Sequence, residues 1–141
     1  MSSIRFFFED IAAADISESK LKPWIIQTIQ REGYQLEELN YIFCSDPYLL
    51  NINKNYLDHD YYTDIITFNN AESESEIEAD IFVSWERVAE NAKNLKTPFI
   101  TELRRVIIHG ILHLMGYNDH DEEEKQEMRK KEEACLSLFP E

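Results

Sequence analysis

The chain has 141 residues, of which 43% are hydrophobic and 12% aromatic, so we expect one folded domain over residues 1–141 with a sizeable core. Its formal net charge of −14 argues against a general nucleic-acid binder, because phosphate contacts need lysine and arginine. It has no run of about 18 apolar residues and no secretory signal, so we expect no membrane partner. Cys44 and Cys135 show no CxxC spacing, and we expect reduced, buried thiols in a cytoplasmic protein.

The first half of the chain predicts strands that alternate with helices. Residues 4–8 and 36–44 are rich in aromatic and branched side chains, which is typical of strands. Between them, leucine and isoleucine recur every four residues within 17–33, which predicts a helix. A second helix is expected over 45–57, because Ser45 or Asp46 is a good N-cap before a proline.

The second half adds two strands and three helices. We expect strands at residues 64–69 and 79–84, joined by an acidic loop, and helices at 84–95, 97–115 and about 121–138. Ser84 is the expected N-cap of the first of these helices, and Gly116 the expected end of the second. Strands in the first half, with helices between and after them, predict an α+β fold in which a small mixed sheet packs with helices.

A histidine cluster occupies HGILHLMGYNDH, residues 109–120. His109 and His113 are four residues apart and therefore lie on one face of a helix. Gly116 lets the chain turn, and counting five residues past the second histidine reaches Asp119. The spacing His-x3-His-x5-ligand is used by many catalytic zinc sites. We predict that these two histidines and Asp119 hold one zinc ion per chain and leave a fourth position for water.

Position 110 separates this cluster from one familiar class of zinc enzyme. Metalloproteases with an HExxH motif carry their glutamate base there, whereas this chain has Gly110. Peptide hydrolysis by that mechanism therefore lacks its base. We expect the small residue to leave room beside the ion.

The segment IIHGILHLMGYND resembles the HGxLHLxGYDH signature of the YbeY family of metal-dependent single-strand endoribonucleases. YYTDIITF (61–68), ADIFVS (79–84) and the acidic C-terminal segment resemble further parts of that family, so the similarity covers about residues 36–138. The resemblance implies a zincin-like fold and a zinc-dependent endoribonuclease for single-stranded RNA. It also implies roles in rRNA processing (16S rRNA 3′ end maturation) and ribosome quality control, with ribosomal RNA and ribosomal or ribosome-assembly proteins as partners.

The third ligand is one of two departures from the family pattern. The family has histidine where this chain has Asp119. A one-residue insertion would instead make His120 the ligand. We favour Asp119, because it needs no insertion and because neighbouring side chains of an extended segment point opposite ways.

The second departure is Leu57, which stands where the family carries an arginine thought to contact RNA. Leucine cannot bind phosphate, and the candidates to compensate are Lys54, His59 and the Arg104–Arg105 pair. His59 is also the candidate helper in catalysis, since histidine titrates near neutral pH.

Two other functions stay open at this point. One is a metal-dependent hydrolase of a different substrate. The other is a non-catalytic ribosome-assembly factor in which zinc only stabilises the fold, and Leu57 favours this second alternative.

Overall fold

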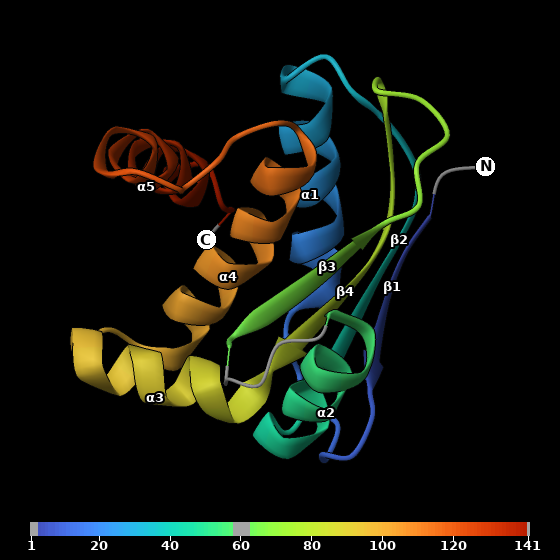
Figure 1. Cartoon of the computed structure of the whole chain (residues 1–141). Helices are drawn as coiled ribbons and strands as arrows, with labels where there is room; N and C mark the ends of the chain where they lie inside the picture. The colour runs from blue at the N-terminus through green and yellow to red at the C-terminus, as the bar shows by residue number, and fades with distance from the viewer. Residues whose placement is uncertain (1–2, 58–62, 141) are drawn as a thin grey trace.

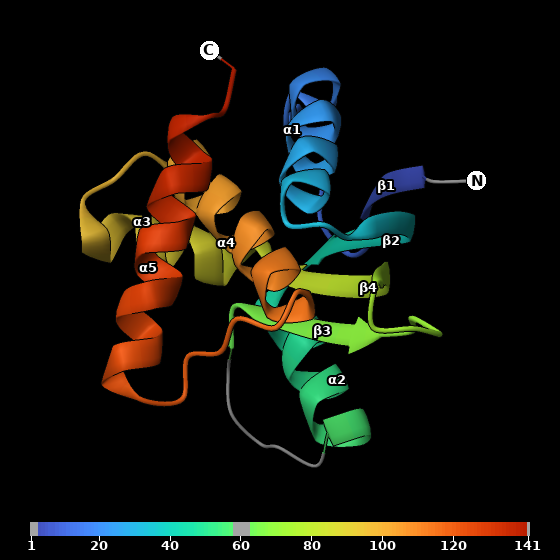
Figure 2. The ribbon, with the colours of Figure 1, turned by 90° about the horizontal axis from the view of Figure 1, so that it is seen from above.

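The computed structural model describes residues 3–57 and 63–140, which form a four-stranded sheet with helices on both faces (Figures 1 and 2). The elements of this part of the chain are β1 (Ser3–Phe8), α1 (Glu18–Arg31), β2 (Gln35–Cys44), α2 (Asp46–Leu57), β3 (Ile65–Asn69), β4 (Glu76–Ser84), α3 (Trp85–Leu95), α4 (Phe99–Leu114) and α5 (Glu122–Ser137). The predicted α+β class, a small mixed sheet packed with helices, is confirmed.

The sheet has the strand order β1-β2-β4-β3. β2 is parallel to both β1 and β4, whereas β3 is antiparallel to β4 and lies at one edge. Seen from above, α1 and α4 lie on one face of the sheet and α2 lies on the other (Figure 2). α5 packs on α4 and also contacts α1, where the Trp24 indole donates to the Cys135 carbonyl at 2.8 Å. The sheet therefore supports α4 directly, and α5 is held through both α4 and α1.

β4 begins earlier than the sequence predicts, at Glu76 and not at Ala79. Its side chains alternate, so that Ile77 and Ala79 are buried in the main core while Glu76 and Glu78 are not. Half of the acidic segment 71–80 is thus strand and not loop. The glutamates hid the two-residue period on which a strand prediction depends.

The predicted roles of Ser45, Ser84 and Gly116 at helix ends are confirmed, whereas α1 and α4 are each slightly shorter than predicted. Ser84 Oγ accepts a hydrogen bond from the Arg87 amide at 3.1 Å and caps α3. Ser45 Oγ accepts one from the Tyr48 amide at 3.2 Å at the start of α2. Gly116 follows α4 with φ of +98°, a conformation that glycine adopts without strain.

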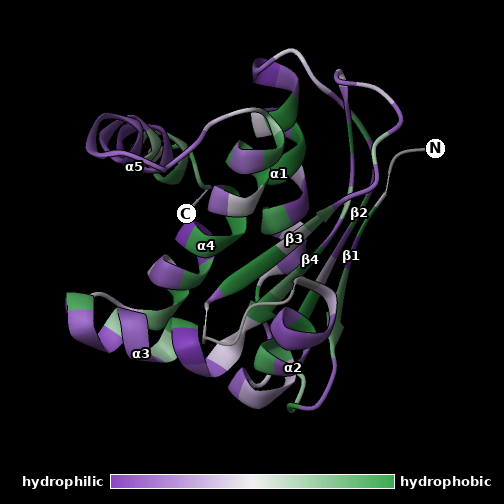
Figure 3. Ribbon diagram, viewed as in Figure 1, coloured by the Kyte–Doolittle hydropathy of each residue, from purple (hydrophilic) through white to green (hydrophobic). Residues whose placement is uncertain are grey.

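α4 is held close against the sheet. The buried Tyr41 hydroxyl donates to the Ile107 carbonyl at 2.8 Å. A Cβ at Gly110 would lie 2.9 Å from Ile65 Cδ1 and 3.3 Å from Ile81 Cδ1. The small residue therefore makes room for the sheet and not for an ion, which corrects the sequence interpretation. The hydropathy colouring agrees, because α4 is hydrophobic along much of its length while α5 is mostly hydrophilic (Figure 3).

We predict that Gly110→Glu prevents stable folding, because its carboxylate would be forced against two isoleucines. Overpacking costs about 1–3 kcal/mol, and an unpaired buried charge costs several more. We expect the free energy of unfolding in urea to fall by at least about 4 kcal/mol. Gly110→Ala is the control, with a loss of about 1–2 kcal/mol, since better helix propensity offsets part of the crowding. Equal stability of the two variants would contradict this packing.

Candidate metal centre

Three side chains converge where α4 ends and the loop to α5 begins. The rings of His109 and His113 have centroids 4.6 Å apart and planes at 84°. Asp119 places Oδ2 at 3.5 Å from His109 Nε2 and Oδ1 at 3.5 Å from His113 Nε2. One donor atom from each residue lies within 4.8 Å of the others. The structure thus brings together the three residues that the spacing singled out.

His120, the alternative third ligand, is placed differently. Its side chain is exposed, and its backbone amide donates to Glu124 Oε1 at 3.1 Å. Asp121 caps α5 by accepting from the Glu124 amide at 2.8 Å. These contacts fix the loop in the register that turns Asp119, and not its neighbour, toward the two imidazoles.

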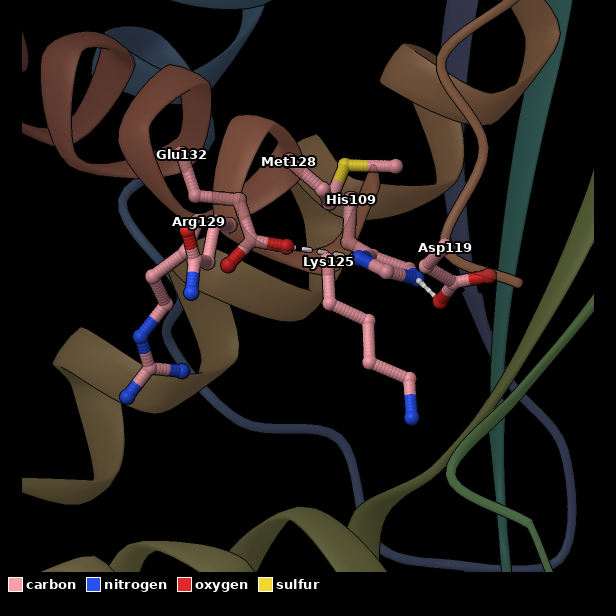
Figure 4. Close-up of a pocket in the computed structure, with 7 residues that line it drawn as sticks. His109, Asp119, Lys125, Met128, Arg129 and Glu132 are labelled. Atoms are coloured by element: carbon pink, nitrogen blue, oxygen red, sulfur yellow. Dashed lines mark hydrogen bonds and ion pairs between the residues drawn. The ribbon is translucent and has the colours of Figure 1, made fainter. Parts of the chain in front are cut away.

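Glu132 on α5 completes the surroundings of His109. Its Oε2 lies 2.6 Å from His109 Nδ1 (Figure 4), and the residue is only 4% exposed. A carboxylate can only accept, so Nδ1 carries the proton and donates. In the neutral ring the lone pair then lies on Nε2, facing Asp119. Metal-binding histidines usually have such a partner, which orients the ring and raises its basicity.

Sequence reasoning missed Glu132. Its signal was present, because Met128, Glu132 and Cys135 follow one another at helical spacing and all are buried. Glutamate is rarely buried without a partner, so its place on the buried face of α5 indicates a specific contact. The many exposed charges of the same helix obscured this pattern.

Arg105 holds the other oxygen of that carboxylate. It pairs with three carboxylates, those of Glu132 at 3.3 Å, Glu133 at 2.8 Å and Glu102 at 3.4 Å. Arg104 places its guanidinium 3.7 Å from the centre of the Phe139 ring. Both arginines therefore face α5 or the C-terminal segment. The idea that this pair compensates for Leu57 in RNA binding is not supported.

The two histidines differ electrostatically. Burial opposes a charge on His109, but the hydrogen bond and negative charge of Glu132 outweigh it and raise the pKa of His109. Burial and the nearby positive charge of His109 lower the pKa of His113. A metal ion would therefore compete with a proton for His109, whereas the lowered pKa keeps His113 neutral near pH 7.

The donor set fits a small divalent ion. Zinc bonds to nitrogen and oxygen are about 2.0–2.2 Å long, so ligand atoms around tetrahedral zinc lie about 3.3–3.6 Å apart. The two separations of 3.5 Å between Nε2 and carboxylate oxygens match this value. With both imidazoles neutral, the two nitrogens and the carboxylate would offer lone pairs to one ion, which would relieve their mutual repulsion.

A pocket of about 380 Å³ opens beside these residues. It is lined by His109, Asp119, Lys125, Gln126, Met128, Arg129 and Glu132. Leu57 is the last residue of α2. His59, the predicted helper, lies outside the described residues and stays a prediction.

Comparisons with known proteins agree on one family. The model of the endoribonuclease YbeY family matches residues 8–139. An endoribonuclease YbeY of Cytophaga hutchinsonii is 49% identical over 96% of this chain and 95% of that protein. One from Porphyromonas gingivalis is 40% identical over 100% of this chain and 93% of that protein. The solution structure of TM1509 from Thermotoga maritima superposes with a TM-score of 0.69 at 29% identity, covering 96% of this chain and 87% of that one.

We predict that Asp119→Ala weakens zinc affinity far more than His120→Ala does. Loss of a direct ligand should exceed the 10–100-fold that outer partners typically contribute, so we expect at least about 100-fold. His120→Ala should stay within about threefold of wild type, and Asp119→His should keep tight binding. Titration against a competing chelator measures all three. A larger loss in His120→Ala than in Asp119→Ala would show that the loop register is wrong.

We predict that Glu132→Gln lowers zinc affinity by about 10–100-fold while the fold is retained. The amide keeps the shape of the side chain but removes the charge that orients and polarises His109. Glu133→Gln is the matched control, because Glu133 also pairs with Arg105 but does not contact His109 in the described part of the chain. Equal affinities of the two variants in the same titration would exclude a role for Glu132 at the centre.

Proposed function

Because the chain belongs to the endoribonuclease YbeY family, we propose that it is a zinc-dependent endoribonuclease that cleaves single-stranded RNA. The convergence of His109, His113 and Asp119 beside a pocket is the observation that supports this most. The family match over residues 8–139 includes all three and supports one functional domain over 1–141.

Zinc is the ion that the donor set favours, because two imidazoles and a carboxylate suit it better than they suit magnesium or calcium. When bound, such an ion supplies a Lewis acid that polarises a phosphate oxygen or acidifies a water molecule. His109, His113 and Asp119 would hold it. A phosphodiester would reach the ion through the pocket that His109 and Asp119 line.

The remaining residues of the site position these ligands. Glu132 keeps the proton on Nδ1 of His109, so that Nε2 can bind. Arg105 neutralises Glu132 and prevents that carboxylate from turning toward the ion. Asp119 directs one oxygen to each histidine, which keeps the three donors together.

Ribosomal RNA is the substrate we propose, with 16S rRNA 3′ end maturation and ribosome quality control as the processes and the cytoplasm as the place. The family membership supports an RNA substrate. A net charge of −14 repels RNA at long range, which favours ribosomal or ribosome-assembly proteins as partners that bring enzyme and substrate together. None of the described helices is long and apolar enough to cross a bilayer.

Leu57 favours a second candidate, a non-catalytic ribosome-assembly factor with a structural zinc ion. An aliphatic side chain at that position supplies no phosphate contact. In this case the metal would contribute to stability, and ligand variants that still fold would still associate with the ribosome.

We predict that zinc-loaded protein cleaves an unstructured RNA oligonucleotide and leaves a duplex of the same sequence largely intact. Chelation should stop cleavage, readdition of zinc should restore it, and His113→Ala should lower the rate at least about 100-fold, since one of three ligands is lost. Gel analysis of end-labelled RNA measures this. If zinc-loaded wild type does not cleave RNA above the His113→Ala control, the nuclease is refuted and the assembly factor is favoured.

A further inference from the structure

Most of the residues that line the pocket beside His109 come from α5. Lys125 and Arg129 both line the pocket together with His109 and Asp119. They are four residues apart and therefore lie on one face of the helix. In Figure 4 both side chains extend downward from α5, and Lys125 passes below the line from His109 to Asp119. Two cations thus reach the same pocket as the proposed metal ligands.

Neither cation is neutralised by a close carboxylate in the described part of the chain. Lys125 Nζ reaches only Glu122, at 3.9 Å, and both side chains are more than half exposed, at 58% and 87%. Arg129 is exposed and has no carboxylate within 4.0 Å in residues 3–57 and 63–140, although its charge acts on Glu102 from farther away. Such long, exposed pairs contribute little, so both side chains can turn to a ligand at low cost.

The carboxylates of the pocket are already satisfied. Glu132 lies between Arg105 and His109, and Asp119 is directed at the two histidines. A divalent ion would balance the charge of Asp119 as well. With the ion bound, the charges of Lys125 and Arg129 would be left over, and the pocket would be positive within a protein of net charge −14.

We propose that Lys125 and Arg129 form a phosphate-binding site for the RNA backbone on α5, beside the metal centre. The proposal rests on the nuclease function and adds the surface that holds the strand. The planar guanidinium of Arg129 suits a bidentate contact with a phosphate, and the ammonium of Lys125 acts as a compact charge. Both are positioning residues, which hold the backbone next to the linkage to be cut and read no base.

The test compares Lys125→Gln, Arg129→Gln and their double variant with Lys130→Gln. The control removes the same charge from the same helix, at a side chain that is 77% exposed and does not line the pocket. Binding of a fluorescent single-stranded RNA oligonucleotide to metal-free protein is measured by anisotropy at several salt concentrations. This readout needs neither zinc nor cleavage.

We expect each single pocket variant to weaken binding about three- to fivefold at low salt, and the double variant about tenfold or more. The slope of log affinity against log salt should become shallower by about 0.7 for each lost contact to single-stranded nucleic acid. Lys130→Gln should stay within about twofold, and Arg129→Lys should keep most of the slope. With zinc-loaded protein, the double variant should raise KM more than it lowers kcat, at unchanged zinc affinity and urea midpoint.

A double variant that binds like Lys130→Gln with an unchanged salt slope would overturn the phosphate site, as would a metal-free protein that does not bind RNA even at the lowest salt. A loss of zinc or of stability in the double variant and in Arg129→Lys would also overturn it, because the cations would then be structural. Failure of the nuclease function looks different. Zinc-loaded wild type would not cleave RNA, yet the pocket variants would still change RNA binding, which would support the phosphate site alone.

Discussion

The hydrogen bond of 2.6 Å between His109 Nδ1 and Glu132 Oε2 connects the two helices that build the candidate site. It crosses from α4, which rests on the sheet, to α5, which does not. Because Glu132 is buried, the bond cannot be lost without leaving a charge in the interior, and Arg105 shares that charge from the other side. Breaking one member of such a buried network is costly, typically by about 3–5 kcal/mol. Together with the ion pairs of Arg105 and the hydrogen bond from Trp24 to Cys135, it therefore helps to hold α5 in its register against α4, and with it the end of the loop that carries Asp119.

The same hydrogen bond determines which nitrogen of His109 is free to bind an ion. It fixes the proton of His109 on the inner nitrogen, so the outer nitrogen is ready for an ion. α4 itself cannot shift easily, because Gly110 brings its backbone against Ile65 and Ile81, and Tyr41 holds the Ile107 carbonyl. Ligands on a rigid helix and a capped loop are already in position before an ion binds. Binding then costs less conformational entropy.

Local chemistry explains which features the sequence predicted. The spacing of His109, His113 and Asp119 is a property of one helix and one turn, and the structure brings the three together. Helix caps such as Ser84 are equally local and were predicted correctly. What failed depends on contacts between distant segments. The role of Glu132 is recognisable only when α5 is packed on α4. The reason for a glycine at position 110 is recognisable only when α4 is packed on the sheet. The early start of β4 was hidden because acidic residues interrupt its hydrophobic alternation.

The central claim is that a divalent ion is bound by two imidazoles and one carboxylate where α4 meets the loop. A crystal structure of the zinc-loaded protein, with anomalous data collected on both sides of the zinc edge, tests it most directly. We expect one strong anomalous peak bound by Nε2 of His109, Nε2 of His113 and a carboxylate oxygen of Asp119, with the Glu132 hydrogen bond intact. A peak bound by His120 with Asp119 turned away, or a peak elsewhere in the protein, would contradict it.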